Sequence, residues 1–216
     1  MTAPFPPNMP IPPAGKRPLT WDPARRNGRQ MMQDVLDQWR SLGRKPDLWV
    51  FGYASLVWRP EFEAAEHRPA KVRGYHRKLS MWSRINRGTH ERPGLVFALM
   101  PGGSCTGVVM RLPHHQVEAH MPALWEREMP NPVYDPKWVV AETAKGPVVA
   151  LAFTLSRKSP SYTGELSEEQ YREIFAKAQG RYGTTLDYAR QTLHGLRRHG
   201  IEDRALARLL RLVHHL

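Results

Sequence analysis

The spacing of apolar residues divides the chain into a helical start, a central series of strands and a helical end. Residues 23–42 carry an apolar side at helical spacing, which predicts an amphipathic helix that stops near Gly43. Short segments rich in β-branched and aromatic residues follow, bounded by glycine and proline. The predicted strands are 48–53, 70–82, 94–100, 104–111, 137–143 and 147–155.

Helical spacing returns near residues 113–129 and again in the last third of the chain. Pro122 lies inside the first of these helices, and because proline cannot donate to the helical ladder we expect a kink or a restart there. Ser167 and Gln170 have the spacing of a capping box. The last helices are predicted at 167–179, 184–199 and 202–214. Strands in series followed by helices favour an α+β or mixed α/β domain around one sheet.

Composition is typical of one globular domain. Of the 216 residues 41% are hydrophobic, and a single cysteine excludes an intrachain disulfide. We expect residues 1–20, which are rich in proline, to be a mobile extension, residues 21–46 to carry the first helix, and residues 47–216 to form the domain. The N-terminus lacks the layout of a secretory signal and no apolar run reaches the length of a membrane span. We therefore expect a cytoplasmic protein with no membrane partner.

The net charge of +12 raises the alternative of a nucleic-acid-binding protein. The charges are spread along the chain, with local concentrations at Arg25-Arg26 and Arg197-Arg198. No helix-turn-helix, zinc-finger or RNA-binding aromatic signature accompanies them. We interpret the charge as solvated surface that would attract an anionic peptide, and we expect no nucleic-acid partner.

Glu128 closes a helical stripe that is otherwise apolar. The stripe is Val117, Met121, Leu124 and Glu128, at spacings of four, three and four. Partial burial near a helix C-terminus would raise the pKa of a carboxylate, and a carboxylate that titrates near neutral pH can act as a general base or acid. The alternative is that the helix frays before Glu128 and leaves this side chain in water.

A second candidate feature follows the first predicted strand. The run Leu48 to Tyr53 leads into Tyr53-Ala54-Ser55-Leu56. Small residues directly after a strand allow backbone N–H groups to converge on an anion.

In order and spacing, these segments resemble the ChaC-like branch of the γ-glutamylcyclotransferases over about residues 47 to 210. Tyr53-Ala54-Ser55-Leu56 resembles the family's Tyr-Gly-Ser-Leu turn. Trp125-Glu126-Arg127-Glu128 resembles its Arg-Glu pair, whose Glu is the catalytic base, and Tyr134 matches a tyrosine that follows. Further matching segments are Arg73-Gly74-Tyr75, the stretch from Arg87 to Leu95, and the stretch from Gly103 to Val108.

The resemblance implies a small, closed, barrel-like mixed β-sheet flanked by helices. It also implies a reaction in which the α-amine of a γ-glutamyl unit attacks its own side-chain amide, so that glutathione gives 5-oxoproline and cysteinylglycine. Glu128 would be the base and then the acid. The substrate would contact Tyr53, Ala54, Ser55, Leu56 and Tyr134. No cofactor and no metal are expected, because the nucleophile is part of the substrate.

The turn departs from the family's pattern at Ala54, where the family has glycine. If this position needs a positive φ, alanine costs on the order of 1 kcal/mol; if φ is negative, the methyl only narrows the pocket. Two alternatives stay open within the resemblance. One is cyclisation of another γ-glutamyl amine or amino acid, and the other is a non-catalytic protein that binds a γ-glutamyl ligand. The oligomeric state is left open.

Other noticeable residues are interpreted as structural. Gly88 and Gly94 are expected to serve turns, while Arg87 between the predicted strands is assigned no role. Cys105 is expected to be buried and inert, and Trp58 to lie in the core. The adjacent histidines at 114–115 and 214–215 point in different directions on a helix, so a pair of them rarely binds one metal ion. We therefore expect both pairs to be surface residues.

Overall fold

Five strands form a closed barrel with the order β1-β3-β2-β4-β5. The computed structural model describes residues 27–43, 46–60 and 62–213. β1 and β5 are parallel and close the barrel through Trp49 opposite Ala150 and Val50 opposite Leu151, while the β2–β3 and β4–β5 pairs are antiparallel. The strands are β1 (Leu48–Gly52), β2 (Glu66–Ser83), β3 (Gly94–Leu112), β4 (Asp135–Thr143) and β5 (Val148–Thr154). The expected closed, mixed sheet is confirmed.

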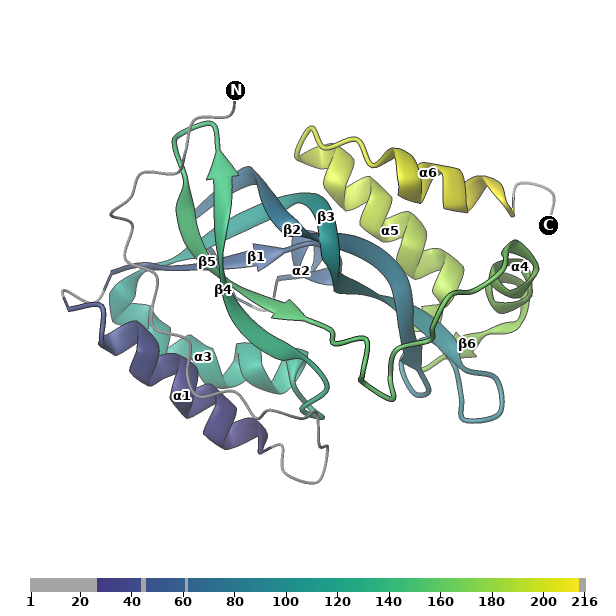
Figure 1. Cartoon of the computed structure of the whole chain (residues 1–216), viewed down its shortest axis with the longest axis horizontal. Helices are drawn as coiled ribbons and strands as arrows, with labels where there is room; N and C mark the ends of the chain where they lie inside the picture. Colours follow the sequence, from purple (N-terminus) through teal and green to yellow (C-terminus); the bar gives the residue numbers. More distant parts are fainter. Residues whose placement is uncertain (1–26, 44–45, 61, 214–216) are drawn as a thin grey trace.

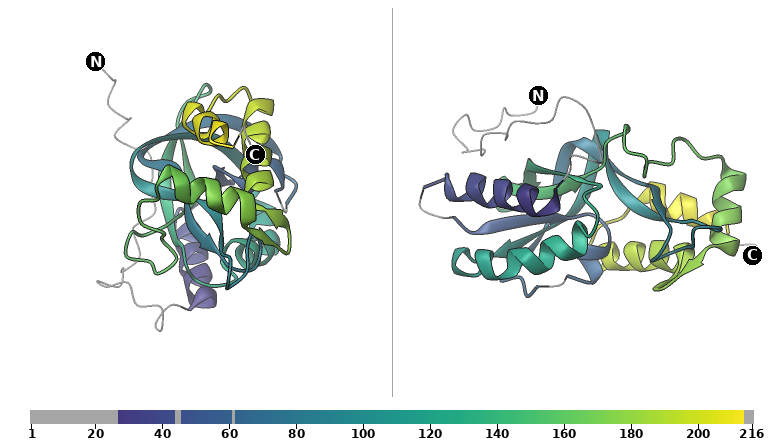
Figure 2. Two further views of the ribbon diagram at one scale, coloured as in Figure 1. Left: turned by 90° about the vertical axis from the view of Figure 1, so that its right-hand side faces the viewer. Right: turned by 90° about the horizontal axis from the view of Figure 1, so that it is seen from below.

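Two groups of helices lie at opposite ends of the barrel (Figure 1). α1 (Gly28–Arg40) and α3 (His114–Glu128) lie together at one end, and α4 (Glu168–Lys177), α5 (Thr185–Arg198) and α6 (Arg204–Arg211) lie at the other, as the views in Figure 2 also show. The short α2 (Ser55–Trp58) follows β1 directly. A two-stranded ribbon, β6 (Gln179–Gly180) with β7 (Gly183–Thr184), precedes α5. In the described part of the chain, no helix is long and apolar enough to cross a membrane.

The two strands predicted at 94–100 and 104–111 are one strand, β3. It pairs with β2 from Glu66 opposite Arg111 to Ser83 opposite Gly94, with a register shift between Arg73 and Tyr75. Gly74, Gly102 and Gly103 lie at this shift with positive φ angles of 83°, 104° and 70°. Glycine adopts these angles without steric cost, so the pair bulges and bends where the sequence indicated a break.

The helix boundaries follow local capping. The side chain of Asn27 accepts a hydrogen bond from the Gln30 amide, so the described part of the first helix begins at Gly28. The capping box is confirmed, since Ser167 and Gln170 bond reciprocally at the start of α4. α3 continues through Pro122 without the restart that we expected. The expectations for residues 1–20 and for the histidine pair 214–215 lie outside the described residues.

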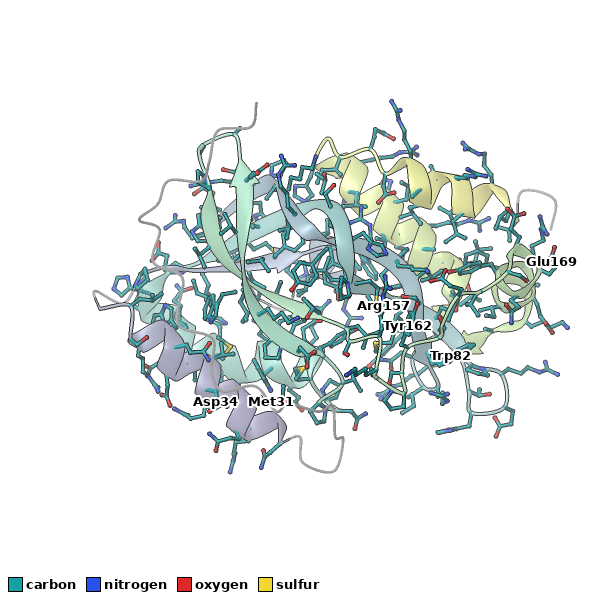
Figure 3. The ribbon with its side chains drawn as sticks, in the orientation of Figure 1. Met31, Asp34, Trp82, Arg157, Tyr162 and Glu169 are labelled. Carbon is teal, nitrogen blue, oxygen red and sulfur yellow. The ribbon has the colours of Figure 1, made fainter. Side chains whose placement is uncertain are left out.

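Side chains from the barrel interior and from both helix groups form one core. In Figure 3, Met31 lies at the α1 end and Trp82 and Tyr162 lie toward the α4 end, and these three side chains pack against the core. Trp125 of α3 packs edge-on against Phe153 of β5, with ring centroids 5.6 Å apart. The helix that ends at Glu128 is therefore fixed directly on the barrel wall.

Candidate active site

The turn after β1 begins with Tyr53 and ends in α2. The amide of Val57 donates to the Ala54 carbonyl at 2.9 Å, which closes the turn. Ala54 has a φ of −144° and a ψ of −116°, so this position does not need the positive φ that would favour glycine. Tyr53, Ala54 and Leu56 are buried and Ser55 is half-buried. That the backbone N–H groups of this turn bind substrate stays a prediction.

Glu128 is the last residue of α3, and its side chain is 14% exposed. The helix holds to its end, since the Met129 amide donates to the Trp125 carbonyl at 2.7 Å. Arg127 Nε donates to Glu128 Oε1 at 3.0 Å, and Arg127 Nη1 donates to the Arg59 carbonyl. The alternative of a frayed, solvated Glu128 is therefore wrong.

Three buried tyrosines surround Glu128. Burial raises the pKa of Tyr53, Tyr134 and Tyr188 well above the usual range of a tyrosine. The negative charge of Glu128 adds to the rise at each of them, so the carboxylate is close to all three phenols. The phenols are connected to the turn, because Tyr134 interacts with Tyr53 and Tyr188 with Ser55 through side-chain hydrogen bonds.

Of the candidate substrate residues, Tyr53 is bonded to another strand and Tyr134 is buried. Tyr53 donates its hydroxyl to the Phe153 carbonyl of β5 at 3.1 Å. Tyr134, directly before β4, is 8% exposed. The structure thus brings Tyr53, Ser55, Glu128 and Tyr134 together at one side of the barrel, although they come from three separate segments: the turn after β1, the end of α3 and the residue before β4.

Tyr188 of α5 was missed by the sequence analysis. The Phe97 amide donates to its hydroxyl at 3.4 Å, and its ring packs against Phe97 and Trp58 with centroids 5.5 and 6.3 Å away. The available signal was its place in a predicted amphipathic helix, which indicates burial but not proximity to Glu128. Trp58 is half-buried against the same core and bonds Thr192 through its indole N–H at 3.2 Å.

The buried side chain of Arg77 holds the backbone of the turn after β1 in place. Arg77 of β2 donates from Nη1 to the carbonyls of Tyr53 at 2.8 Å and Thr106 at 3.1 Å, and its side chain is 4% exposed. Its guanidinium also pairs with Asp203, with Nε 3.0 Å from Oδ2. Asp203 Oδ1 accepts from the Leu206 amide at 2.8 Å and so caps α6. This ion pair joins the C-terminal helix to the turn that carries Tyr53.

Three glycines allow backbone segments to meet beside the site. A Cβ on Gly88 would lie 2.0 Å from the Gly94 nitrogen, one on Gly94 would lie 2.0 Å from the Arg87 carbonyl oxygen, and one on Gly180 would lie 2.5 Å from the Gly88 nitrogen. The structural role expected for Gly88 and Gly94 is confirmed. These contacts hold Arg87 in place, and Arg87 Nη1 donates to the Tyr182 carbonyl.

Gly94→Ala is expected to lower the free energy of unfolding by about 3 kcal/mol, because its methyl would overlap the Arg87 backbone. Urea denaturation followed by circular dichroism measures this. Gly28→Ala is the matched control, since its nearest neighbours would lie 3.7 Å away, and its effect should stay within about 1 kcal/mol. Equal stability of Gly94→Ala and wild type would contradict the close approach of the two backbones.

The remaining candidate groups are structural. Cys105 is 2% exposed and burial raises the pKa of its thiol, which matches the expected inert role. His114 and His115 are exposed at the start of α3. No group of three or more histidine, cysteine or carboxylate side chains is placed to hold a metal in the described part of the chain.

Comparison with known proteins gives consistent matches. The family model for the ChaC-like protein matches residues 48–216. The glutathione-specific gamma-glutamylcyclotransferase of Escherichia coli (strain K12) is 33% identical over 174 residues, which cover 79% of this chain and 75% of that protein. Glutathione-specific gamma-glutamylcyclotransferase 1 of Homo sapiens is 33% identical over 154 residues, which cover 69% of each chain.

Solved structures match the fold. A crystal structure described as a yeast γ-glutamylcyclotransferase specific to glutathione has a TM-score of 0.68 at 19% identity, and the match covers 79% of this chain and 99% of that one. A structure described as a gamma-glutamyl cyclotransferase has a TM-score of 0.50 at 12% identity, covering 76% of this chain and 86% of that one.

Proposed function

The chain belongs to the ChaC-like family of glutathione-specific γ-glutamylcyclotransferases, and from this we propose that it converts glutathione to 5-oxoproline and cysteinylglycine. In this reaction the α-amine nitrogen bonds to the γ-carbonyl carbon, and the γ-amide C–N bond breaks. The observation that carries the proposal is the position of Glu128, half-buried and close to three phenols beside the turn after β1.

Glu128 is proposed to move the proton that the reaction requires. The α-amine begins as an ammonium ion and can attack only after it loses a proton, which a nearby carboxylate can accept. The same carboxyl then returns the proton to the leaving nitrogen, so that cysteinylglycine departs as an amine. Arg127 orients the carboxylate from the side through its 3.0 Å hydrogen bond to Oε1.

The tyrosines are proposed to orient the substrate as neutral hydrogen-bonding groups. Because burial raises the pKa of Tyr53, Tyr134 and Tyr188 above the ordinary value of a tyrosine, all three keep their protons at physiological pH. Fixed donors near a developing oxyanion stabilise it without reorganisation. The backbone N–H groups of the Ala54-Ser55-Leu56 turn are proposed to hold the α-carboxylate end of the γ-glutamyl unit, where the two tyrosines Tyr53 and Tyr134 line the pocket.

The alternatives differ in what supports them. Ala54 motivated a non-catalytic relative; its negative φ removes the part of that reason that rests on a positive φ, and leaves the part that rests on a methyl narrowing the pocket. Cyclisation of another γ-glutamyl amine shares the same site chemistry and differs only in the leaving group. A cytoplasmic location, and the absence of a cofactor and of nucleic-acid or membrane partners, stay predictions.

The test is to incubate the purified full chain with glutathione and to quantify 5-oxoproline and cysteinylglycine by mass spectrometry. We expect the two products in equal amounts. Glutathione binding without either product would contradict the proposed reaction and favour another γ-glutamyl substrate or a binding role. Absence of glutathione binding, together with salt-dependent binding to DNA or RNA, would support the nucleic-acid alternative.

A further inference from the structure

Arg87 is a buried cation that the mechanism above does not use. It lies between β2 and β3 and is 8% exposed. Its Nη1 donates to the Tyr182 carbonyl, and its guanidinium carbon lies 5.0 Å from the centre of the Tyr188 ring. A guanidinium removed from water is costly unless it is paired, so its surroundings should provide an anion.

Within the described part of the chain, no carboxylate lies within ion-pair distance of Arg87. Asp187 is near enough for its charge to raise the pKa of Arg87, but it accepts its hydrogen bonds from Thr184 and remains exposed. Burial is the largest effect on Arg87 and lowers its pKa. Among the residues that the structure describes, this cation is therefore held in a fixed position without a carboxylate counter-ion.

A second guanidinium adds to the positive potential at this position. The charge of Arg59 acts on Arg87 and lowers its pKa further. Arg59 lies 5.7 Å from the ring centre of Tyr182, whose carbonyl accepts from Arg87 and whose side chain is 49% exposed. A carboxylate matches the planar fork of the Arg87 guanidinium.

The Tyr188 ring connects this position to the reaction site. Its hydroxyl side interacts with Ser55 and senses the charge of Glu128, while the guanidinium of Arg87 lies over its ring. The α-carboxylate of a γ-glutamyl unit is bonded to the carbon that carries the attacking amine, so it must stay near Glu128. The other carboxylate of glutathione is at the far end of the leaving dipeptide. An extended dipeptide reaches about 7 Å, which is enough to pass one tyrosine ring.

We propose that Arg87 binds the terminal carboxylate of the leaving dipeptide and thereby selects glutathione over γ-glutamyl compounds without that carboxylate. This inference rests on the proposed function and adds to it the part of the substrate that the turn and Glu128 do not contact. The side chain of Arg87 thus acts in substrate specificity and takes no part in proton transfer.

The test compares glutathione with glutathione amide, in which a neutral carboxamide replaces the glycine carboxylate. For wild type we expect kcat/KM to fall by about 10- to 100-fold on the amide, mainly through KM, because a charge-assisted contact is lost. Arg87→Gln should lose a similar factor on glutathione and almost nothing further on the amide. Arg87→Lys, which keeps the charge without the fork, should lie between the two. Arg84→Gln, at an exposed position three residues away, removes one charge and should match wild type on both substrates.

Two outcomes would overturn this inference while the proposed function stands. One is equal kcat/KM of wild type for glutathione and its amide, which needs no variant and so does not depend on folding. The other is an equal loss by Arg87→Gln on both substrates, which would make Arg87 a structural residue. If neither compound yields 5-oxoproline, the proposed function fails, and titration calorimetry then decides the inference: at least tenfold weaker binding of the amide supports it, and equal binding overturns it.

Discussion

Glu128→Gln is expected to lower kcat for 5-oxoproline formation by about 10²- to 10⁴-fold, which is the usual contribution of a general base. Glutamine has the same shape and can still accept the hydrogen bond from Arg127 Nε, but it cannot take a proton from the ammonium group. Glutamine is neutral, so the substitution removes a negative charge near the three phenols and places no new charge among them. The protein should therefore stay folded. Steady-state kinetics with glutathione measures the change.

The control for this substitution is Glu126→Gln, two residues earlier on the same helix and exposed. It removes the same charge away from the tyrosines, so its kcat should equal that of wild type. Glutathione binding by Glu128→Gln, measured by calorimetry, should stay within about tenfold, since the amide oxygen can still accept a hydrogen bond although the charge of the carboxylate is lost. Full activity of Glu128→Gln would show that another group accepts the proton.

Arg77→Met is expected to lower the free energy of unfolding by about 3–5 kcal/mol, the typical cost of removing one partner of a buried ion pair. Methionine keeps most of the apolar stem but leaves Asp203 without its cation and the Tyr53 and Thr106 carbonyls without a donor. The free energy is measured by urea denaturation. The Tyr53 carbonyl lies at the start of the turn that is proposed to bind the substrate. The folded fraction of this variant should therefore also show a raised KM for glutathione.

Arg73→Met is the matched control on the same strand. Arg73 pairs with Glu142 at 2.9 Å, but both side chains are exposed, so the loss should be about 0–1 kcal/mol. Equal losses in the two variants would mean that the Arg77–Asp203 pair is worth no more than a surface ion pair.

The sequence predicted most of the elements, because periodicity is a local property. It divided β3 in two, since Gly102 and Gly103 are typical of a turn as well as of a bulge. It missed α2, β6 and β7, which are too short to show any period. Barrel closure came from the resemblance alone, because the pairing of β1 with β5 joins segments far apart in the chain and leaves no local pattern.

The candidate site was predictable where a linear motif exists and not elsewhere. Glu128, Tyr134 and the turn at Tyr53 lie in segments that resemble the family's motifs, and the structure places them together. Tyr188 approaches from a helix in the last third of the chain. The Arg77–Asp203 pair joins residues 126 positions apart, and nothing in either residue's neighbourhood indicates the other. Pairs of this kind are found only when three-dimensional contacts are known.

The pairing of segments far apart in the sequence also has a consequence for folding during synthesis. The hydroxyl of Tyr53 reaches its acceptor on Phe153 across 100 residues, and the Tyr53 carbonyl is held by an arginine whose own partner is Asp203. During synthesis, the turn at Tyr53 leaves the ribosome long before Phe153 and Asp203 have been made. Non-local pairings form late because chain closure is entropically costly. We therefore expect that a growing chain cannot convert glutathione until α6 has docked through Asp203, and that the proposed activity appears only then.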